Sequence, residues 1–268
     1  MLADFAILDG PELERPLLLV SWTRHAISEI SVHDLATGQR TGTVPLPGLG
    51  TLGGLSERPE GGHEAWFGYT DNTTPPLVLR YDARSGTPVI WERPPGRVEV
   101  PEISARQVAY PSKDGTVVRM LVISGDARPD GQHPRPTILY GYGGFDVSMQ
   151  PSYSPSILAW VERGGVYAIA SLRGGGDEGE DWHRAGMREH KQNVFDDFHA
   201  AAEKLIADGW TTREQLAISG GSNGGLLVGA AITQRPDLYA AAACSAPLLD
   251  MVRYERFKIG ETWNVEYG

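Results

Sequence analysis

The sequence predicts a chain of the α/β class in two parts: a run of short strands, then a domain with a parallel-rich sheet and flanking helices. Residues 1–98 contain segments rich in β-branched and aromatic residues, separated by turn signals. In residues 99–268, strand-like and helix-like segments alternate, which is typical of a parallel sheet covered by helices. A serine flanked by glycines, Ser222, stands between two such segments of the second part. The strand candidates of the first part are residues 16–23, 27–34, 63–70 and 75–82.

An internal repeat indicates what the first part forms. The segments "SVHDLATG" and "LRYDARSG" both read as a strand end followed by Asp-x-x-Ser/Thr-Gly, and their aspartates, Asp34 and Asp82, lie 48 positions apart. A period in this range, with about four strands per unit, is the signature of β-propeller blades. Two coincidental hairpin turns are the alternative, because Asp-x-x-Gly is common. Since a propeller usually takes about four to eight blades, residues 1–98 are expected to be the C-terminal blades of a larger one.

The second part has five strand candidates and one clear helix. The helix spans residues 193–209, where five apolar residues share one face and Gly209 provides a C-terminal stop. We interpret Asp196 and Asp197 as first-turn charges that complement the helix dipole rather than as chemical groups. The strand candidates are residues 117–124, 136–143, 166–172, 215–219 and 239–246, and the apolar helix face comprises Phe195, Phe198, Ala201, Ala202 and Leu205.

Composition and charge exclude several classes of partner. The chain has 268 residues, 41% of them hydrophobic, and a net charge of −10, which argues against nucleic acid and an anionic membrane because both require a basic face. No stretch approaches the roughly 18 apolar residues of a membrane span, and the N-terminus has no basic region followed by an apolar one. A soluble, cytoplasmic protein is expected. Its single cysteine, Cys244, is interpreted as a buried, inert thiol.

The surroundings of Ser222 match the strand-to-helix turn that presents a nucleophilic serine. Residues 220–224 fit G-x-S-x-G, with "QLAIS" ahead as a strand and "GGLLVGAAITQ" behind as a helix. The residues two before and two after the serine must be tiny, so that strand and helix can approach closely. The alternative is a glycine-rich helix N-terminus that binds an anion. The chain has no G-x-x-x-x-G-K-[ST] segment to support phosphate binding.

Five segments, in order along the chain, carry a resemblance to a known family. They are "YGYGGF" (140–145), "SLRGGGDEGEDWHRAG" (171–186), "KQNVFDDF" (191–198), "GGSNGGLL" (220–227) and "QRPDLY" (234–239). Together they resemble the prolyl oligopeptidase family of serine peptidases, and the match runs from about residue 110 to the last residue. The resemblance implies an α/β-hydrolase domain capped by a β-propeller. It also implies short peptide substrates, which the prolyl-specific members cleave after proline.

The resemblance assigns roles to individual residues. Ser222 matches the nucleophile, and the backbone N–H of Asn223 matches one donor to the oxyanion. Tyr142 matches the tyrosine whose hydroxyl is the other donor; without the resemblance, a packed tyrosine at a strand end would be the simpler interpretation. Two donors directed at the developing oxyanion can lower the barrier by several kcal/mol, about 3–4 for each.

The resemblance also implies a pocket for the substrate's proline ring. Trp263 matches the tryptophan that stacks on this ring, and three further residues match positions that line the pocket: Phe145, Leu248 and Tyr267. The context "GGSNGG" is closer to prolyl-specific members than to the branch that cuts after Lys or Arg, which usually reads more like "GRSAGG". That branch, an acylaminoacyl-type peptidase and a non-catalytic interaction protein remain the alternatives.

The base that a nucleophilic serine needs is not evident. In α/β-hydrolases the triad follows the order Ser, Asp or Glu, His, yet the seven histidines all precede Ser222: His25, His33, His63, His133, His183, His190 and His199. Asp237 and Asp250 follow the serine too closely to match the family's triad aspartate. The triad aspartate and histidine are therefore expected outside a chain that is truncated at both ends relative to the family.

Three consequences are expected from this arrangement. The 268-residue chain alone is predicted to be essentially inactive, because loss of the base alone removes most of the catalysis of a serine hydrolase. An open propeller edge and a sheet without its last strands are predicted to expose apolar surface. No cofactor is implied, and His183 and His190 show no metal-ligand spacing, so structural or surface roles are expected for them. The oligomeric state is left open.

Overall fold

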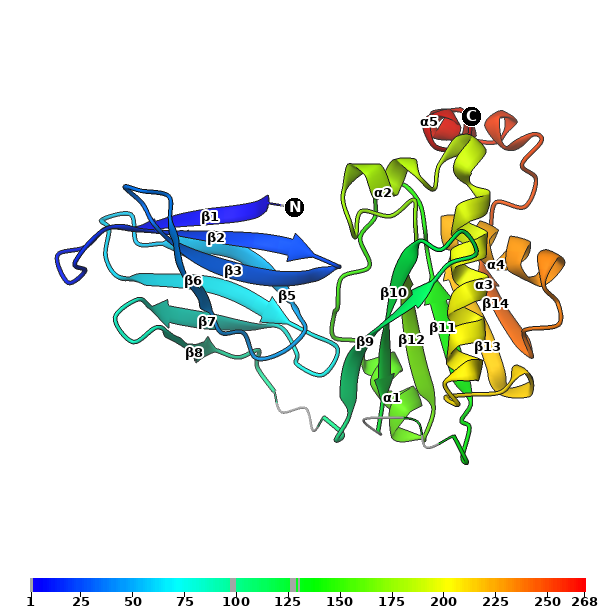
Figure 1. Cartoon of the computed structure of the whole chain (residues 1–268), viewed down its shortest axis with the longest axis horizontal. Helices are drawn as coiled ribbons and strands as arrows, with labels where there is room; N and C mark the ends of the chain where they lie inside the picture. The colour runs from blue at the N-terminus through cyan, green and yellow to red at the C-terminus, as the bar shows by residue number, and fades with distance from the viewer. Residues whose placement is uncertain (1, 97–99, 126–128, 130) are drawn as a thin grey trace. The chain divides into compact units, whose positions relative to one another are not determined.

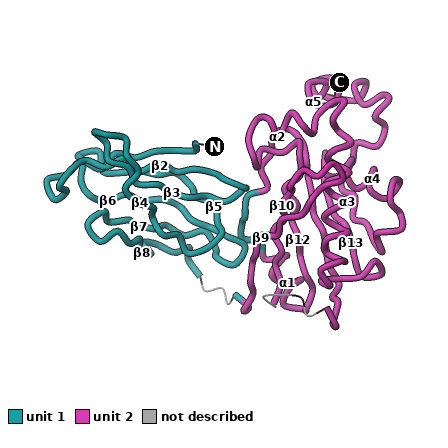
Figure 2. The backbone as a smooth tube through the Cα atoms, viewed as in Figure 1, with its two compact units in different colours: residues 1–100, 150–154 teal, residues 101–149, 155–268 magenta. Residues whose placement is uncertain are grey.

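The computed structural model describes residues 2–96, 100–125, 129 and 131–268, which fall into two compact units (Figures 1 and 2). Unit 1 comprises Met1–Val100 and Gln150–Ser154, and unit 2 comprises Pro101–Met149 and Pro155–Gly268. The domain boundary predicted between residues 98 and 99 lies outside the described residues.

Unit 1 consists of two four-stranded antiparallel sheets, each formed by consecutive strands. The first sheet contains β1 (Leu2–Leu8), β2 (Leu17–Arg24), β3 (Ile27–Asp34) and β4 (Arg40–Val44). The second contains β5 (Thr51–Glu57), β6 (Glu64–Thr70), β7 (Leu77–Asp82) and β8 (Thr87–Glu92). Each repeat therefore supplies one four-stranded sheet, as a propeller blade requires. The sequence had indicated β2, β3, β6 and β7 but not the outer strands.

The repeated aspartates explain why both repeats turn at the same place. In each repeat a glycine N–H donates to the aspartate carbonyl: Gly38 to Asp34 at 2.8 Å and Gly86 to Asp82 at 2.9 Å. Both glycines have positive φ, 70° and 69°, which a side chain would strain. Each aspartate carboxylate also accepts a hydrogen bond from a backbone N–H two or three residues later. This combination is an Asx-type turn between two strands.

Unit 2 is built on one six-stranded mixed sheet, in the order β14-β13-β11-β12-β10-β9. β9 and β10 are antiparallel to their neighbours, whereas β12, β11, β13 and β14 run parallel. This is an α/β-hydrolase arrangement, as predicted. The strands are β9 (Ser104–Pro111), β10 (Val117–Ser124), β11 (Thr137–Gly141), β12 (Val166–Ser171), β13 (Leu216–Gly221) and β14 (Ala241–Ser245). The helices are α1 (Pro155–Glu162), α2 (Glu180–Arg184), α3 (Gln192–Ala207), α4 (Asn223–Gln234) and α5 (Asn264–Tyr267).

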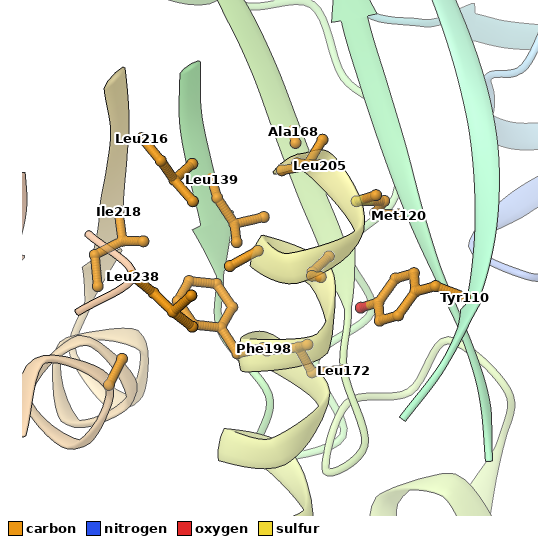
Figure 3. Packing of buried hydrophobic residues seen from close by; sticks show 14 of the residues in the cluster. Tyr110, Met120, Leu139, Ala168, Leu172, Phe198, Leu205, Leu216, Ile218 and Leu238 are labelled. Carbon is orange, nitrogen blue, oxygen red and sulfur yellow. The ribbon is translucent and has the colours of Figure 1, made fainter. Parts of the chain in front are cut away.

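The core of unit 2 lies between the sheet and α3 (Figure 3). α3 buries one face against the strands, and Phe198 and Leu205 on that face are fully enclosed. On the sheet side, the contacts come from strand residues such as Leu139 and Ile218. Of the predicted helix face, Phe195 is only half-buried, and Val194 takes the enclosed position instead. The core holds α3 and the parallel strands in fixed positions, and the strand ends carry the site.

Two interpretations from the sequence were wrong. Neither Asp196 nor Asp197 is a first-turn charge, because α3 begins at Gln192 and no acidic residue lies in its first turn. The Asp197 carboxylate is fully buried. It accepts hydrogen bonds from Arg173 at 2.6 Å and from the Ser112 hydroxyl at 2.5 Å, so it pairs a buried guanidinium. Cys244 is exposed, because it lies on β14, the last strand in the sheet order. Its thiol donates to the Gly225 carbonyl at 3.3 Å.

Candidate active site

Ser222 stands on a sharp turn between β13 and α4. Its backbone has φ 56° and ψ −118°, a left-handed conformation that is strained for a residue with a side chain, and the residue is exposed. The predicted need for tiny neighbours is confirmed. A Cβ at Gly220 would lie 2.2 Å from the Gly224 carbonyl oxygen, and one at Gly224 would lie 2.6 Å from the Gly141 oxygen. The turn therefore has the geometry of a nucleophile elbow.

The sheet topology places the ends of three parallel strands around this serine. β11, β13 and β14 are neighbours, with Tyr140 in register with Ser219 and Gly221 with Ser245. The carboxyl ends of parallel strands meet at one edge of a sheet. The chain order also changes at β11, since β12 lies on one side of it and β13 on the other. Ligands of open α/β sheets bind at such a switch point.

A cavity of about 250 Å³ opens at this edge. Six of the seven residues that the sequence singled out line it: Tyr142, Phe145, Ser222, Leu248, Trp263 and Tyr267. These residues come from four segments far apart in the sequence. Three of the segments follow β11, β13 and β14, and the fourth is the last nine residues of the chain. The seventh, Asn223, is buried beside the cavity as the first residue of α4. Its backbone N–H is one of the helix N–H groups that have no intrahelical acceptor.

Aromatic rings form much of the cavity wall. The rings of Phe145 and Tyr267 meet edge to face with centroids 5.6 Å apart, and Tyr254 meets Tyr267 in the same way at 5.4 Å. None of the six lining residues is charged. Such a wall suits an apolar, ring-shaped group rather than a charged side chain.

Hydrogen bonds join the elbow to the loop that follows β11. The side-chain amide of Asn223 donates to the Tyr142 carbonyl at 2.5 Å and accepts from the Tyr267 hydroxyl at 2.9 Å. Lys191 Nζ donates to the next carbonyl along the loop, that of Gly143, at 2.8 Å. The elbow, the loop and α5 are therefore held together by partly buried hydrogen bonds as well as by packing.

Sequence reasoning missed the charged pair behind this loop. Lys191 Nζ lies 3.6 Å from Glu266 Oε1, and Glu266 Oε2 lies 2.8 Å from His183 Nε2. Burial lowers the pKa of Lys191 to about 8, although Glu266 opposes this shift. Lys191 was part of the motif "KQNVFDDF", but no spacing pattern marks a buried lysine paired 75 residues downstream. His183 has the structural role that was expected of it.

Asp177 holds the same loop from another side. Its Oδ1 accepts hydrogen bonds from the Met149 N–H at 2.9 Å and the Ser148 hydroxyl at 3.3 Å. Its Oδ2 is buried and has no hydrogen-bond partner among the described residues. Burial raises the pKa of Asp177 to about 6, and the two hydrogen bonds oppose the shift. Folding therefore shifts Asp177 toward its protonated form relative to the unfolded chain.

Replacing Asp177 with asparagine is expected to make the free energy of unfolding less dependent on pH. Because the folded-state pKa is raised, the stability linked to Asp177 is present below its unfolded pKa and is lost as pH rises through about 6. Asparagine stays neutral, so the variant should gain about 2 kcal/mol relative to the unsubstituted protein between pH 4 and pH 7.5. Urea denaturation at the two pH values measures this. Asp146→Asn, at an exposed carboxyl of the same loop, is the control, and an equal gain there would contradict the assignment.

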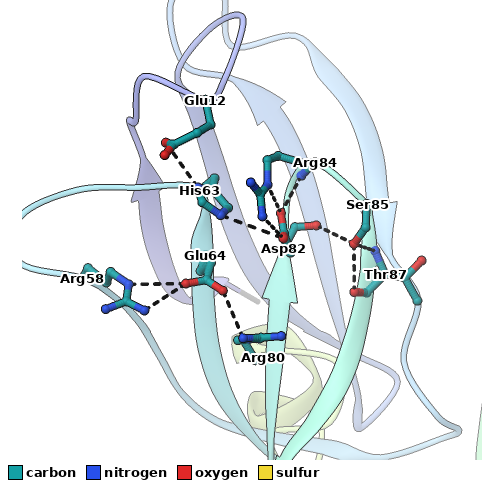
Figure 4. Close-up of polar contacts among 9 residues, drawn as sticks. All are labelled: Glu12, Arg58, His63, Glu64, Arg80, Asp82, Arg84, Ser85 and Thr87. Carbon is teal, nitrogen blue, oxygen red and sulfur yellow. Dashed lines mark hydrogen bonds and ion pairs between the residues drawn. The ribbon is translucent and has the colours of Figure 1, made fainter.

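One cluster of potential metal ligands occurs among the described residues, and it lies in unit 1 (Figure 4). Ligand atoms of His63, Glu64 and Asp82 all lie within 4.8 Å of one another. Each carboxylate is already paired, however: Glu64 contacts Arg58 and Arg80, and Asp82 contacts Arg84. These arginines neutralise the charge that a cation would need.

The fold, the elbow and the cavity define the class of protein: an α/β-hydrolase domain preceded by propeller blades. Two family models match the chain. The model of the prolyl oligopeptidase family matches residues 151–268, and that of the prolyl oligopeptidase N-terminal β-propeller domain matches residues 6–94. The chain therefore belongs to the prolyl oligopeptidase family, which confirms the resemblance. No helix within the described part of the chain is long and apolar enough to cross a membrane.

Named relatives agree with the family. A prolyl endopeptidase of Elizabethkingia miricola is 40% identical over 250 residues, covering 92% of this chain and 35% of the relative. One from Dictyostelium discoideum is 34% identical over 270 residues, covering 99% and 35%. A structure from a study of two prolyl endopeptidases superposes with TM-score 0.88 at 44% identity, covering all of this chain and 38% of that one. The chain thus spans about a third of the length of these relatives.

Proposed function

We propose that this chain is part of a longer serine peptidase that hydrolyses short peptides on the carboxyl side of proline. Ser222 would attack the scissile carbonyl and form an acyl-enzyme. The Asn223 backbone N–H and the Tyr142 hydroxyl would donate to the oxyanion. Trp263, Phe145, Leu248 and Tyr267 would enclose the proline ring.

The observation that carries this proposal is the composition of the cavity beside Ser222. The elbow serine shares the cavity with a leucine and four aromatic residues, two of which, Phe145 and Tyr267, meet at right angles. A pyrrolidine ring is compact and apolar, so it matches such a wall, whereas a Lys or Arg side chain would lose its hydration without gaining a partner. Similarity supports it too, since prolyl oligopeptidase B of Galerina marginata, 30% identical to this chain, was solved bound to a 35mer hydrolysis and macrocyclization substrate.

The proposal also holds that the general base that would activate Ser222 is not part of this chain. Among the described residues, the cavity lining contains no histidine and no carboxylate. His183 is paired with Glu266, and His199 is hydrogen-bonded to the Tyr239 hydroxyl at 2.8 Å. We propose that the activating histidine and its aspartate belong to a part of the peptidase outside these 268 residues, and that this chain alone is inactive.

A substrate panel tests the proposal. The full-length protein should cleave a peptide amide with proline at the cleavage position much faster than matched substrates with arginine there or with an N-acylated terminal residue. Faster cleavage after arginine, or removal of the N-acylated residue, would instead assign the protein to another branch of the family. No hydrolysis of any of the three would favour a non-catalytic protein.

Replacing Trp263 with alanine is expected to lower kcat/KM for the proline substrate by about 30-fold, because the proline ring loses an apolar contact worth about 2 kcal/mol. The same peptide with alanine at that position should lose less than about 3-fold, since its methyl group reaches little of the indole. The measurement is kcat/KM for both peptides in the full-length protein. Trp91→Ala, at an exposed tryptophan of β8, is the matched control. Equal losses on the two peptides would show that Trp263 does not recognise proline.

A further inference from the structure

Two side chains donate hydrogen bonds to consecutive backbone carbonyls of the loop that follows β11. Asn223 Nδ2 holds the Tyr142 carbonyl, and Lys191 Nζ holds the Gly143 carbonyl. On the preceding side, Tyr140 is paired within the sheet. The backbone of Tyr142 is therefore anchored both before and after its Cα atom, which sets the direction in which its side chain leaves the chain.

The Gly143 carbonyl depends on Lys191 because the loop is tightly enclosed. Gly143 is buried and has φ 63°, and a Cβ there would lie 2.3 Å from Val194 Cγ1 of α3. A buried carbonyl in such a place needs a donor from the protein. Lys191 stands at the start of α3, and its ammonium is itself retained by Glu266, which is 3% exposed.

We propose that Lys191 is a positioning residue of the peptidase: by holding the Gly143 carbonyl, it fixes the Tyr142 hydroxyl where the oxyanion forms. The inference rests on the proposed function of Tyr142. Lys191 does not line the cavity. It acts through the backbone of the loop, and Glu266 acts through Lys191. The pair thus links the last turn of the described chain, α5, to the oxyanion donor.

The position of a donor matters more in the transition state than in the ground state. An oxyanion donor acts only when it lies within about 3 Å of the place that the oxyanion will occupy. Lys191 Nζ also lies 5.5 Å from the centre of the Tyr267 ring in the cavity wall, and a methionine at this position keeps an apolar contact for that ring. Losing the hydrogen bond to the Gly143 carbonyl is expected to displace the Tyr142 hydroxyl more than it displaces the rings that enclose proline. The loss should therefore fall on kcat and leave KM almost unchanged.

A double-mutant cycle in the full-length protein tests this. Lys191→Met is expected to lower kcat for the proline substrate by about 10-fold and to change KM by less than about 2-fold, below the 10²–10³-fold range for losing an oxyanion donor. In a Tyr142→Phe background, the same Lys191→Met change should lower kcat by less than about 2-fold, because no hydroxyl remains to be positioned. Lys113→Met, at a lysine whose side chain is 79% exposed, is the matched control and should have no effect.

The outcomes are distinguishable. An equal loss of kcat in both backgrounds would mean that Lys191 merely supports folding. No loss of kcat in either background would mean that the hydrogen bond from Lys191 to Gly143 is dispensable. Each of these results overturns the inference. If Lys191→Met does not fold, Lys191→Gln must show the same dependence on Tyr142, and a failure to do so overturns the inference as well. Failure of the unsubstituted protein to cleave the peptide would instead overturn the proposed function.

Discussion

Replacing Ser222 with alanine in the full-length protein is expected to lower kcat for a proline-containing peptide by about 10⁵- to 10⁶-fold. The elbow geometry gives the reason. Ser222 is exposed at the cavity in a strained turn, and neither Gly220 nor Gly224 has room for a side chain. No other serine lines this cavity among the described residues. Without the hydroxyl, the proposed acyl-enzyme could not form, and only the proposed oxyanion donors and substrate binding would remain.

The matched control for this prediction is Ser219→Ala, three residues earlier on β13. Ser219 is half-buried within the strand and does not line the cavity, so its variant should keep nearly full activity. Initial rates of peptide hydrolysis, measured with enzyme pure enough to detect residual activity of one part in 10⁶, decide the matter. A Ser222→Ala protein that keeps more than about 1% of the activity would show that the nucleophile lies elsewhere.

Replacing Tyr142 with phenylalanine is expected to lower kcat by about 10²- to 10³-fold, with little change in KM. The change removes one hydroxyl and leaves the ring that contributes to the cavity wall. Because the oxyanion exists only in the transition state and the intermediate, the loss should appear in kcat rather than in substrate binding. Steady-state kinetics with the proline peptide provide both constants.

Tyr167→Phe is the control for that experiment. Tyr167 is a half-buried tyrosine of β12 in the same sheet, and its hydroxyl does not line the cavity. We expect its variant to match the unsubstituted protein in kcat. A Tyr142→Phe variant that retained kcat and raised KM would mean that the hydroxyl binds ground-state substrate instead of stabilising the oxyanion.

Much of the fold could be predicted because its signals are local. The Asp34 and Asp82 turns repeat with the period of a blade, and each turn is closed by a glycine and a carboxylate a few residues away. The elbow is equally local, since Gly220, Ser222 and Gly224 form it within five residues. The cavity residues are dispersed, and they were found through the family resemblance rather than through spacing.

The features that sequence reasoning missed depend on contacts between distant segments. The burial of Asp197 follows from Arg173 and Ser112, the latter 85 positions away. The exposure of Cys244 follows from the place of β14 at the end of the strand order. The hydrogen bond from Lys191 Nζ to the Gly143 carbonyl joins the start of α3 to a loop 48 positions earlier. The local sequence around a residue does not show whether the fold brings a distant segment into contact with it.

The most direct test of the account is covalent labelling of Ser222. The full-length protein is treated with a fluorophosphonate probe, digested and mapped by mass spectrometry, with and without a proline-containing peptide as competitor. We predict that the label falls on the peptide that carries Ser222, that the proline peptide slows it, and that the 268-residue chain alone is labelled far more slowly. Labelling of a different residue, or rapid labelling of Ser222 in the 268-residue chain alone, would contradict the account.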